Sequence, residues 1–222
     1  MNPYATTANW SLQPWSTPAP SLFGALPQLS LVPESLGAVL KFTFSPISSS
    51  SEASLLDCVV LGPQPRVYFR VNTAGAEQRT IVRNHRLEDV VVVNWTNQPS
   101  VLVRTPSASP SNTRSTGQTQ LVVPETKTAE WLSLSGPGSS RMMQVRGCTF
   151  CWIEGDGALQ LRIPGELQEP HRPESAPLAY IQRWEDDVLM AQLQITTEAV
   201  RLGLLEACIA ATILLMSSRQ ID

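Results

Sequence analysis

The sequence predicts a mainly β protein, a closed antiparallel β-barrel of about 12 strands that encloses a hydrophobic C-terminal α-helix. Short segments that alternate apolar and polar residues recur from Leu36 onward, as they do in half-buried strands. The chain then ends in an apolar run, Leu202 to Met216. That run is apolar on nearly every face of a helix, so protein or lipid must surround it.

Protein is the favoured surrounding for this helix. Only 17 residues separate Arg201 from Arg219, and Glu206 is among them, whereas a spanning helix needs about 20 apolar residues. We expect a central helix at about 198–217, with Thr197 as its N-cap and Glu198 in its first turn. A membrane tail anchor and a helix that caps an open sheet are the alternatives.

Residues 1–36 predict an N-terminal arm that is extended or disordered. They hold six prolines, no basic residue and one acid, Glu34. Trp10 and Trp15 lie in this arm, where they either dock on a surface or have no structural role. The barrel domain is expected to be residues 37–222.

The strand signals follow one another with short breaks. Segments rich in Val, Ile, Phe, Tyr and Trp are bounded by Ser, Pro, Gly and Asp. We expect strands at residues 39–44, 55–60, 66–73, 79–83, 89–95, 100–104, 120–123, 130–134, 142–146, 148–154, 158–163, 178–184 and 188–195. Tight turns are expected at residues 155–157 and 186–187, and Ser- or Pro-rich loops at 48–54, 105–119 and 164–177.

Two segments show the alternation most clearly. One expected face of residues 66–73 is apolar, with Val67, Phe69 and Val71, and the other carries Arg66, Tyr68 and Arg70. In residues 158–163, Leu159, Leu161 and Ile163 oppose Gln160 and Arg162. One apolar and one solvated face is the pattern of a barrel wall.

Composition and charge narrow the function classes. The net charge of −3 argues against general nucleic-acid binding. Residues 37–153 carry 11 basic and 7 acidic residues, whereas residues 154–198 carry 3 basic and 9 acidic. No secretory signal is visible and four cysteines are few, so we expect a reduced, cytoplasmic setting.

No pattern of catalytic or metal-ligating residues stands out, so we predict no enzyme, no cofactor and no metal site. Cys148 and Cys151 form a lone C-x-x-C, and residues three apart on a strand point to opposite faces. His85 and His171 lie in unrelated polar segments, and no G-x-S-x-G elbow is present.

Arginines provide the best candidate binding site, for an anion or lipid head group. The two-residue period puts Arg66 with Arg70, and Arg79 with Arg83, on shared strand faces. If their strands pair, the guanidinium groups would form one exterior patch that binds phosphate, with Arg86 nearby. The alternative is ordinary ion pairing with acidic neighbours, namely Glu77, Glu88 and Asp89. Glu206, inside the predicted helix, needs a partner near a barrel mouth, and we interpret it as a structural register device.

Several short motifs occur in a recognisable order. They are Tyr68–Thr73, Arg79–Arg83, Val93-Asn94-Trp95 followed by Pro99-Ser100, Cys151-Trp152, Leu178–Ile181 and Leu193–Ile195 before the apolar helix. Over residues 38–220 the chain resembles an uncharacterised fungal domain family related to the tubby-like and LURP-one-like β-barrels. The resemblance implies a 12-stranded barrel threaded by its C-terminal helix. Better-known relatives bind phosphoinositides through basic exterior residues or are linked to lipid scrambling.

The predicted function is therefore that of a non-enzymatic binding or scaffold domain of the tubby-like type. It would act in the cytoplasm, peripherally at membranes, on anionic phospholipid head groups or on a protein partner. The alternative is a membrane-associated protein, tail-anchored or scramblase-like, that handles lipid.

Overall fold

The computed structural model describes residues 38–47, 54–74, 78–106, 119–135, 140–164, 176–184 and 190–222. Within them, 13 strands form one sheet in the order β7-β6-β5-β4-β3-β2-β1-β13-β12-β11-β10-β9-β8. The predicted arm, residues 1–36, lies outside the described residues, as do the expected turn at 186–187 and most of the three expected loops. The prediction of a mainly β protein is confirmed.

Each of the 13 predicted strand segments overlaps a strand of the sheet. The strands are β1 (Val39–Pro46), β2 (Cys58–Leu61), β3 (Val67–Ala74), β4 (Arg79–Asn84), β5 (Asp89–Asn94), β6 (Ser100–Pro106), β7 (Thr119–Lys127), β8 (Leu132–Leu134), β9 (Arg141–Val145), β10 (Cys148–Gly155), β11 (Ala158–Arg162), β12 (Ala179–Arg183) and β13 (Ala191–Thr196). The expected tight turn after β10 is present, with Asp156 and Gly157 both at positive φ, as a two-residue hairpin requires.

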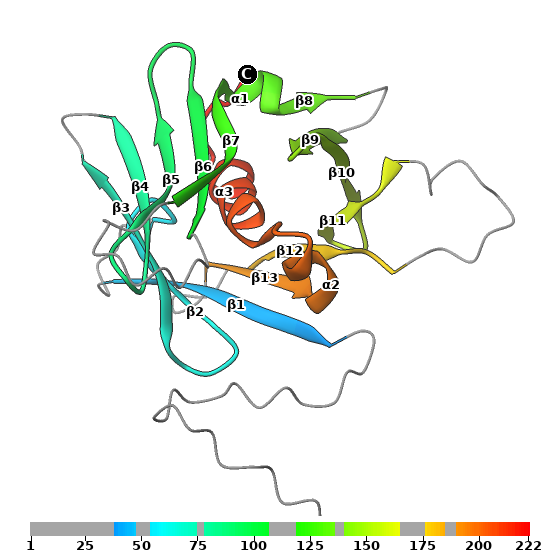
Figure 1. Ribbon diagram of the computed structural model, residues 1–222, viewed down its shortest axis with the longest axis horizontal. Helices are drawn as coiled ribbons and strands as arrows, with labels where there is room; N and C mark the ends of the chain where they lie inside the picture. Colours follow the sequence, from blue (N-terminus) through cyan, green and yellow to red (C-terminus); the bar gives the residue numbers. More distant parts are fainter. Residues whose placement is uncertain are drawn as a thin grey trace, which may run out of the picture. The chain divides into compact units, whose positions relative to one another are not determined.

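Strands that are consecutive in the sequence pair with one another, except β7 and β8, and one long-range pair joins the two ends of the domain. β1 lies antiparallel to β13, from Val39 opposite Thr196 to Phe44 opposite Ala191. The sheet curves, and α3 (Leu205–Met216) lies against its inner face (Figure 1). α3 contacts β5 and β6 in one half of the sheet and β12 and β13 in the other. The helix is therefore shared between the two halves.

The C-terminal helix is surrounded by protein on every side over its middle. Every residue from Glu206 to Leu214 is buried, as expected for a helix with no polar face. Small residues allow this close contact, since Ala207, Ala210 and Ala211 are fully buried. None of the helices in the described part of the chain has the length and apolarity that crossing a bilayer requires.

The predicted single helix is in fact two helices, which corrects our expectation for residues 198–217. α2 (Thr197–Arg201) ends before Gly203, which has a φ of 74°. The amide of Leu204 donates to Ala199 O and that of Gly203 to Val200 O, the pattern of a Schellman C-cap with glycine in the left-handed region. The N-cap is Thr196, not Thr197, and its hydroxyl accepts from Ala199 N. Leu202, at the break between the helices, is exposed.

The sheet is not closed by hydrogen bonds, so the predicted closed barrel is not confirmed. Its edge strands in the described residues are β7 and β8, which are consecutive in the chain. All neighbouring strands are antiparallel and the two edges lie twelve steps apart, so β7 and β8 run in the same direction. Between them, α1 (Thr128–Trp131) forms one helical turn within the segment predicted as a strand at 130–134. The path β7–α1–β8 thus resembles one interrupted strand that pairs first with β6 and then with β9.

Side chains hold this seam, the gap between β7 and β8, together. Trp131 of α1 donates from its indole nitrogen to Gln144 O of β9 at 2.9 Å. The buried Thr128 hydroxyl donates to Ile221 O at 2.6 Å, which attaches the C-terminal segment to α1. The Asp222 carboxylate pairs with both terminal nitrogens of Arg141 on β9, at 2.9 and 2.7 Å.

Candidate functional site

Three of the predicted arginines, Arg70, Arg79 and Arg83, lie on the outer face of β3 and β4. Arg70 lies directly opposite Arg83, and Arg79 lies opposite Ala74. Val71 and Val82, the neighbouring residues on each strand, face the core and are fully buried. Arg70 and Arg83 are both exposed, and we call them the arginine pair.

Arg66 does not follow the alternation that predicted it on the same face. The register between β2 and β3 shifts between Val60 and Leu61, so Tyr68 is an extra residue opposite no partner. The Tyr68 ring then lies edge-on to the core residue Phe42, with centroids 5.5 Å apart. Val67 is 36% exposed although the pattern placed it inside. Because a bulge interrupts the two-residue period, the expected shared face of Arg66 and Arg70 does not extend past Tyr68.

Ion pairing accounts for part of the arginine set. Arg83 Nε contacts Asp89 Oδ1 at 2.8 Å, and both side chains remain substantially exposed, at 48% and 36%. Glu88, another predicted partner, accepts instead from the buried Asn84 amide at 2.8 Å. Glu77 lies outside the described residues. Arg86 is exposed in the turn that Asn84 organises, where its backbone amide donates to Asn84 Oδ1.

Arg79 lies at the other end of β4. At about 3.3 Å per residue, the four residue steps from Arg79 to Arg83 span about 13 Å along the strand. Its Nε is buried and has no hydrogen-bond partner among the described residues. On β5 it lies opposite Asn94, whose amide donates to Glu125 Oε1 at 3.1 Å. The arginines therefore form a stripe with two ends rather than one phosphate-sized cluster.

Glu206 is buried at the start of α3, near the seam. The Thr105 hydroxyl at the end of β6 donates to Glu206 Oε2 at 3.0 Å. Burial raises the pKa of the carboxyl, while its own backbone amide, the Thr105 hydroxyl and the positive charge of Arg146 act to lower that pKa. The Arg146 guanidinium lies over Gly203, where an added Cβ would come within 2.8 Å of it. Glu206 thus joins groups from both sides of the seam, in line with its interpretation as a register device.

The cysteines and histidines do not form a cluster in the described part of the chain. All four thiols are free, with Cys148 exposed and Cys151 buried. Burial raises the pKa of Cys58 to about 12 and that of Cys208 well above its usual value, so neither is an activated nucleophile. His85 is exposed and His171 lies outside the described residues. Where side chains are described, no three His, Cys, Asp or Glu residues lie close enough together to bind one metal ion.

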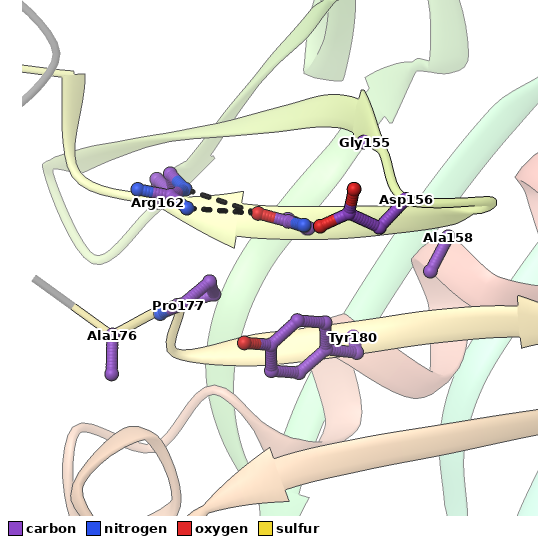
Figure 2. Close-up of a pocket in the computed structure, with 8 residues that line it drawn as sticks. Gly155, Asp156, Ala158, Arg162, Ala176, Pro177 and Tyr180 are labelled. Carbon is purple, nitrogen blue, oxygen red and sulfur yellow. Dashed lines mark hydrogen bonds between the residues drawn. The ribbon is translucent and has the colours of Figure 1, made fainter. Parts of the chain in front are cut away.

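A hollow of about 340 Å³ lies elsewhere, on the outer face of β11 and β12 (Figure 2). It is lined by Gly155, Asp156, Ala158, Gln160, Arg162, Ala176, Pro177 and Tyr180. Arg162 donates to Gln160 Oε1 from Nε at 3.2 Å and from a terminal nitrogen at 2.9 Å. Gln160 and Tyr180 are partners across the two strands. Sequence reasoning missed this site because nothing in the local pattern indicates that residues 160 and 180 are neighbours.

The chain has no match among family models, curated proteins or solved structures. The resemblance to the tubby-like and LURP-one-like barrels therefore stays a prediction that rests on the sequence motifs.

Proposed function

We propose that residues 38–222 form a non-enzymatic binding module that engages an anionic phospholipid head group at the cytoplasmic face of a membrane. The arginine pair, Arg70 and Arg83, would make the primary contact. Arg79 and Arg86 would extend it along β4 and into the following turn.

The observation that supports the proposal is the register of β3 and β4. Side chains directly opposite on antiparallel strands have Cβ atoms about 4.5–5.5 Å apart, and like charges there are destabilising. The arginine pair occupies such a position on an exposed face. A phosphate between two guanidinium groups would remove the repulsion and accept charge-assisted hydrogen bonds from both. Asp89 offsets only part of the positive charge of the arginine pair, because among the described residues its carboxylate contacts Arg83 at Nε alone.

The charge distribution agrees with this choice of ligand. The excess of basic over acidic residues lies in residues 37–153, which contain the arginine pair, and the acidic excess lies in residues 154–198. Arginine also binds phosphate with two parallel hydrogen bonds, which lysine does not. The family resemblance points the same way, because the tubby-like relatives use basic exterior residues for phosphoinositides.

Liposome sedimentation tests the proposal. Vesicles of phosphatidylcholine alone would be compared with vesicles that also contain phosphatidylserine or a phosphoinositide, at low and at physiological salt. We expect the full chain to sediment only with the anionic vesicles, and less at higher salt, because exposed charges are screened. Arg70→Gln/Arg83→Gln should abolish sedimentation. Its fold should hold, because the variant removes a like-charge contact and one exposed ion pair worth less than about 1 kcal/mol.

A matched control removes the same charge elsewhere. Lys41 on β1 and Arg183 on β12 are both exposed and lie outside the arginine stripe. Lys41→Gln/Arg183→Gln should sediment like the unmodified chain. Equal losses in both double variants would show that net charge, not the arginine pair, drives the association. Sedimentation with neither vesicle type would contradict the lipid proposal itself.

A further inference from the structure

The hollow on the outer face of β11 and β12 is a second site with its own chemistry. It belongs to a different part of the sheet from the arginine stripe, since four strands lie between β4 and β12 in the sheet order. Its volume of about 340 Å³ is at the lower end of the range typical of small-molecule sites. In Figure 2 the Tyr180 ring lies on one side, Arg162 lies on the strand above it and Asp156 in the turn that precedes this strand, and Ala176 and Pro177 close one end.

The side-chain amide of Gln160 has a fixed orientation in the hollow. Arginine has no acceptor, so the atom of the Gln160 amide that faces Arg162 must be the oxygen. The amide nitrogen is therefore directed the other way, toward Gly155. A Cβ at Gly155 would lie only 3.1 Å from this nitrogen, so the absence of a side chain there leaves room beside it. The Gln160 nitrogen is a positioned donor at the wall of the hollow.

The charges of the hollow balance. Arg162 supplies a cation and Asp156 an anion, while Gln160 and Tyr180 are neutral groups that donate and accept hydrogen bonds. A site for a phosphate or carboxylate would have an excess of positive charge, which this one lacks. The mixture of donors and acceptors suits a ligand with many hydroxyl groups, each of which both donates and accepts. The Tyr180 ring adds an apolar surface with a polar tip, against which the C–H face of a sugar ring packs.

Polar side chains continue from the hollow across the outer face of the sheet. Gln194 on β13 is the strand partner of Tyr180, and Gln182 on β12 is the partner of Gln192 on β13. The Gln194 amide donates to Gln192 Oε1 at 2.9 Å. This row of amides provides neutral hydrogen-bonding groups next to the hollow for a ligand longer than one ring.

From this geometry we propose that the hollow binds a sugar residue of a neutral glycan. The ring packs on Tyr180, and Asp156, Gln160 and Arg162 hydrogen-bond its hydroxyl groups. Gln192 and Gln194 contact the next residue of the chain. The proposal is independent of the arginine pair and of lipid binding.

The test uses the full chain and a panel of neutral oligosaccharides made of glucose, mannose, galactose, xylose or N-acetylglucosamine, with sialylated and sulfated glycans beside them. Binding would be followed by isothermal calorimetry and by NMR line shifts at ligand concentrations up to about 10 mM, well above a millimolar Kd. We expect at least one neutral glycan to bind, with no preference for its charged derivatives. Arg70→Gln/Arg83→Gln should bind the glycan unchanged.

Variants locate the site. Tyr180→Ala should weaken binding at least about tenfold, as for an aromatic residue that anchors a ligand. Tyr180→Phe keeps the ring and should retain most of the affinity, and Asp156→Asn should weaken binding several-fold while leaving the exposed turn folded. Trp184→Ala is the matched control, because Trp184 is an exposed aromatic residue near the end of β12 that does not line the hollow. Absence of binding by every neutral glycan, preference for the charged glycans, or equal loss in Trp184→Ala and Tyr180→Ala would each overturn the proposal.

Discussion

The buried helix α3 makes a quantitative prediction about what holds this sheet in shape. Ile213 is fully buried within the hydrophobic core. Truncating it to alanine removes three carbons and leaves a cavity, a change that costs about 2–5 kcal/mol in protein cores. α3 contacts β5 and β6 on one side and β12 and β13 on the other. Filling the cavity would require both halves of the sheet to move, so we expect the upper part of that range, about 3–5 kcal/mol.

The assay is equilibrium unfolding in urea, followed by circular dichroism, with thermal melting beside it. For a domain of this size each kcal/mol lowers Tm by about 2–4 °C, so Ile213→Ala should melt about 6–20 °C below the unmodified chain. Leu202→Ala is the matched control. Leu202 is 46% exposed in the break between α2 and α3, and a surface change of this kind costs less than about 0.5 kcal/mol.

Two results would refute the reasoning. One is an Ile213→Ala variant no less stable than Leu202→Ala, which would mean that α3 is not part of the core in solution. The other is a cooperative β-sheet melt from a fragment of residues 37–201, which lacks α3 altogether. A tail-anchored protein would give that second result, because its sheet would fold without the helix.

Three further predictions concern the ends of the core and the N-terminal segment. Glu206→Gln should be more stable than the unmodified chain at neutral pH. Burial raises the pKa of Glu206 in the folded state above its ordinary value of 4.5. The unmodified chain therefore keeps its full stability below pH 4.5 and loses stability as the pH rises through the folded-state pKa, whereas glutamine does not ionise. Urea titrations at several pH values should therefore show that the free energies of unfolding of the variant and of the unmodified chain become equal at about pH 4. A difference in unfolding free energy that does not change with pH would contradict this reasoning. Trp131→Phe removes the donor to Gln144 O across the seam and should cost about 1–2 kcal/mol, with faster amide exchange in β8 and β9 than in β3 and β4; uniform exchange would mean that the seam is no weaker than the rest. Removal of residues 1–36 should lower Tm by less than about 5 °C, and a larger fall would show that Trp10 or Trp15 packs on the domain.

The strands were predictable because their signal is local. In β13, for example, Ala191, Leu193 and Ile195 are fully buried and the intervening glutamines face outward, so the alternation in the sequence is the alternation in the structure. The buried helix was predictable for a similar reason. Its apolar residues lie on every side of the helix, so no face is left that could be exposed to water. What alternation cannot reveal is an extra residue. The bulge at Tyr68 moved Arg66 off the expected face, and nothing in the segment 66–73 distinguishes that strand from a regular one.

The candidate sites were predictable only where both partners lie close in the chain. Arg70 and Arg83 belong to consecutive strands, so their shared face followed from one hairpin and the two-residue period. Gln160 and Tyr180 also belong to sequential strands, but the segment between β11 and β12 is too long to fix the register from the sequence. A shift of one residue would have put Gln160 opposite an inward-facing residue. The contact of Glu206 with Thr105 joins residues 101 apart, and only the tertiary fold brings them together.

The seam explains why the sequence predicted a closed barrel whereas the sheet in the structure is not closed by hydrogen bonds. Closure by hydrogen bonds between antiparallel edges requires those edges to run in opposite directions, but β7 and β8 run in the same direction. Their free edges cannot continue the antiparallel pattern with each other. At the helical turn α1 the chain stops pairing with β6 and begins to pair with β9, so the backbone hydrogen bonds of the sheet are interrupted there.

Side chains must then supply the cohesion that backbone hydrogen bonds supply elsewhere. Trp131, Thr128 and Arg141 do this at one end, and Glu206 with Thr105 does it at the start of α3. Such contacts are individually weak. The buried helix α3 adds to them, because it packs against β5 and β6 in one half of the sheet and against β12 and β13 in the other.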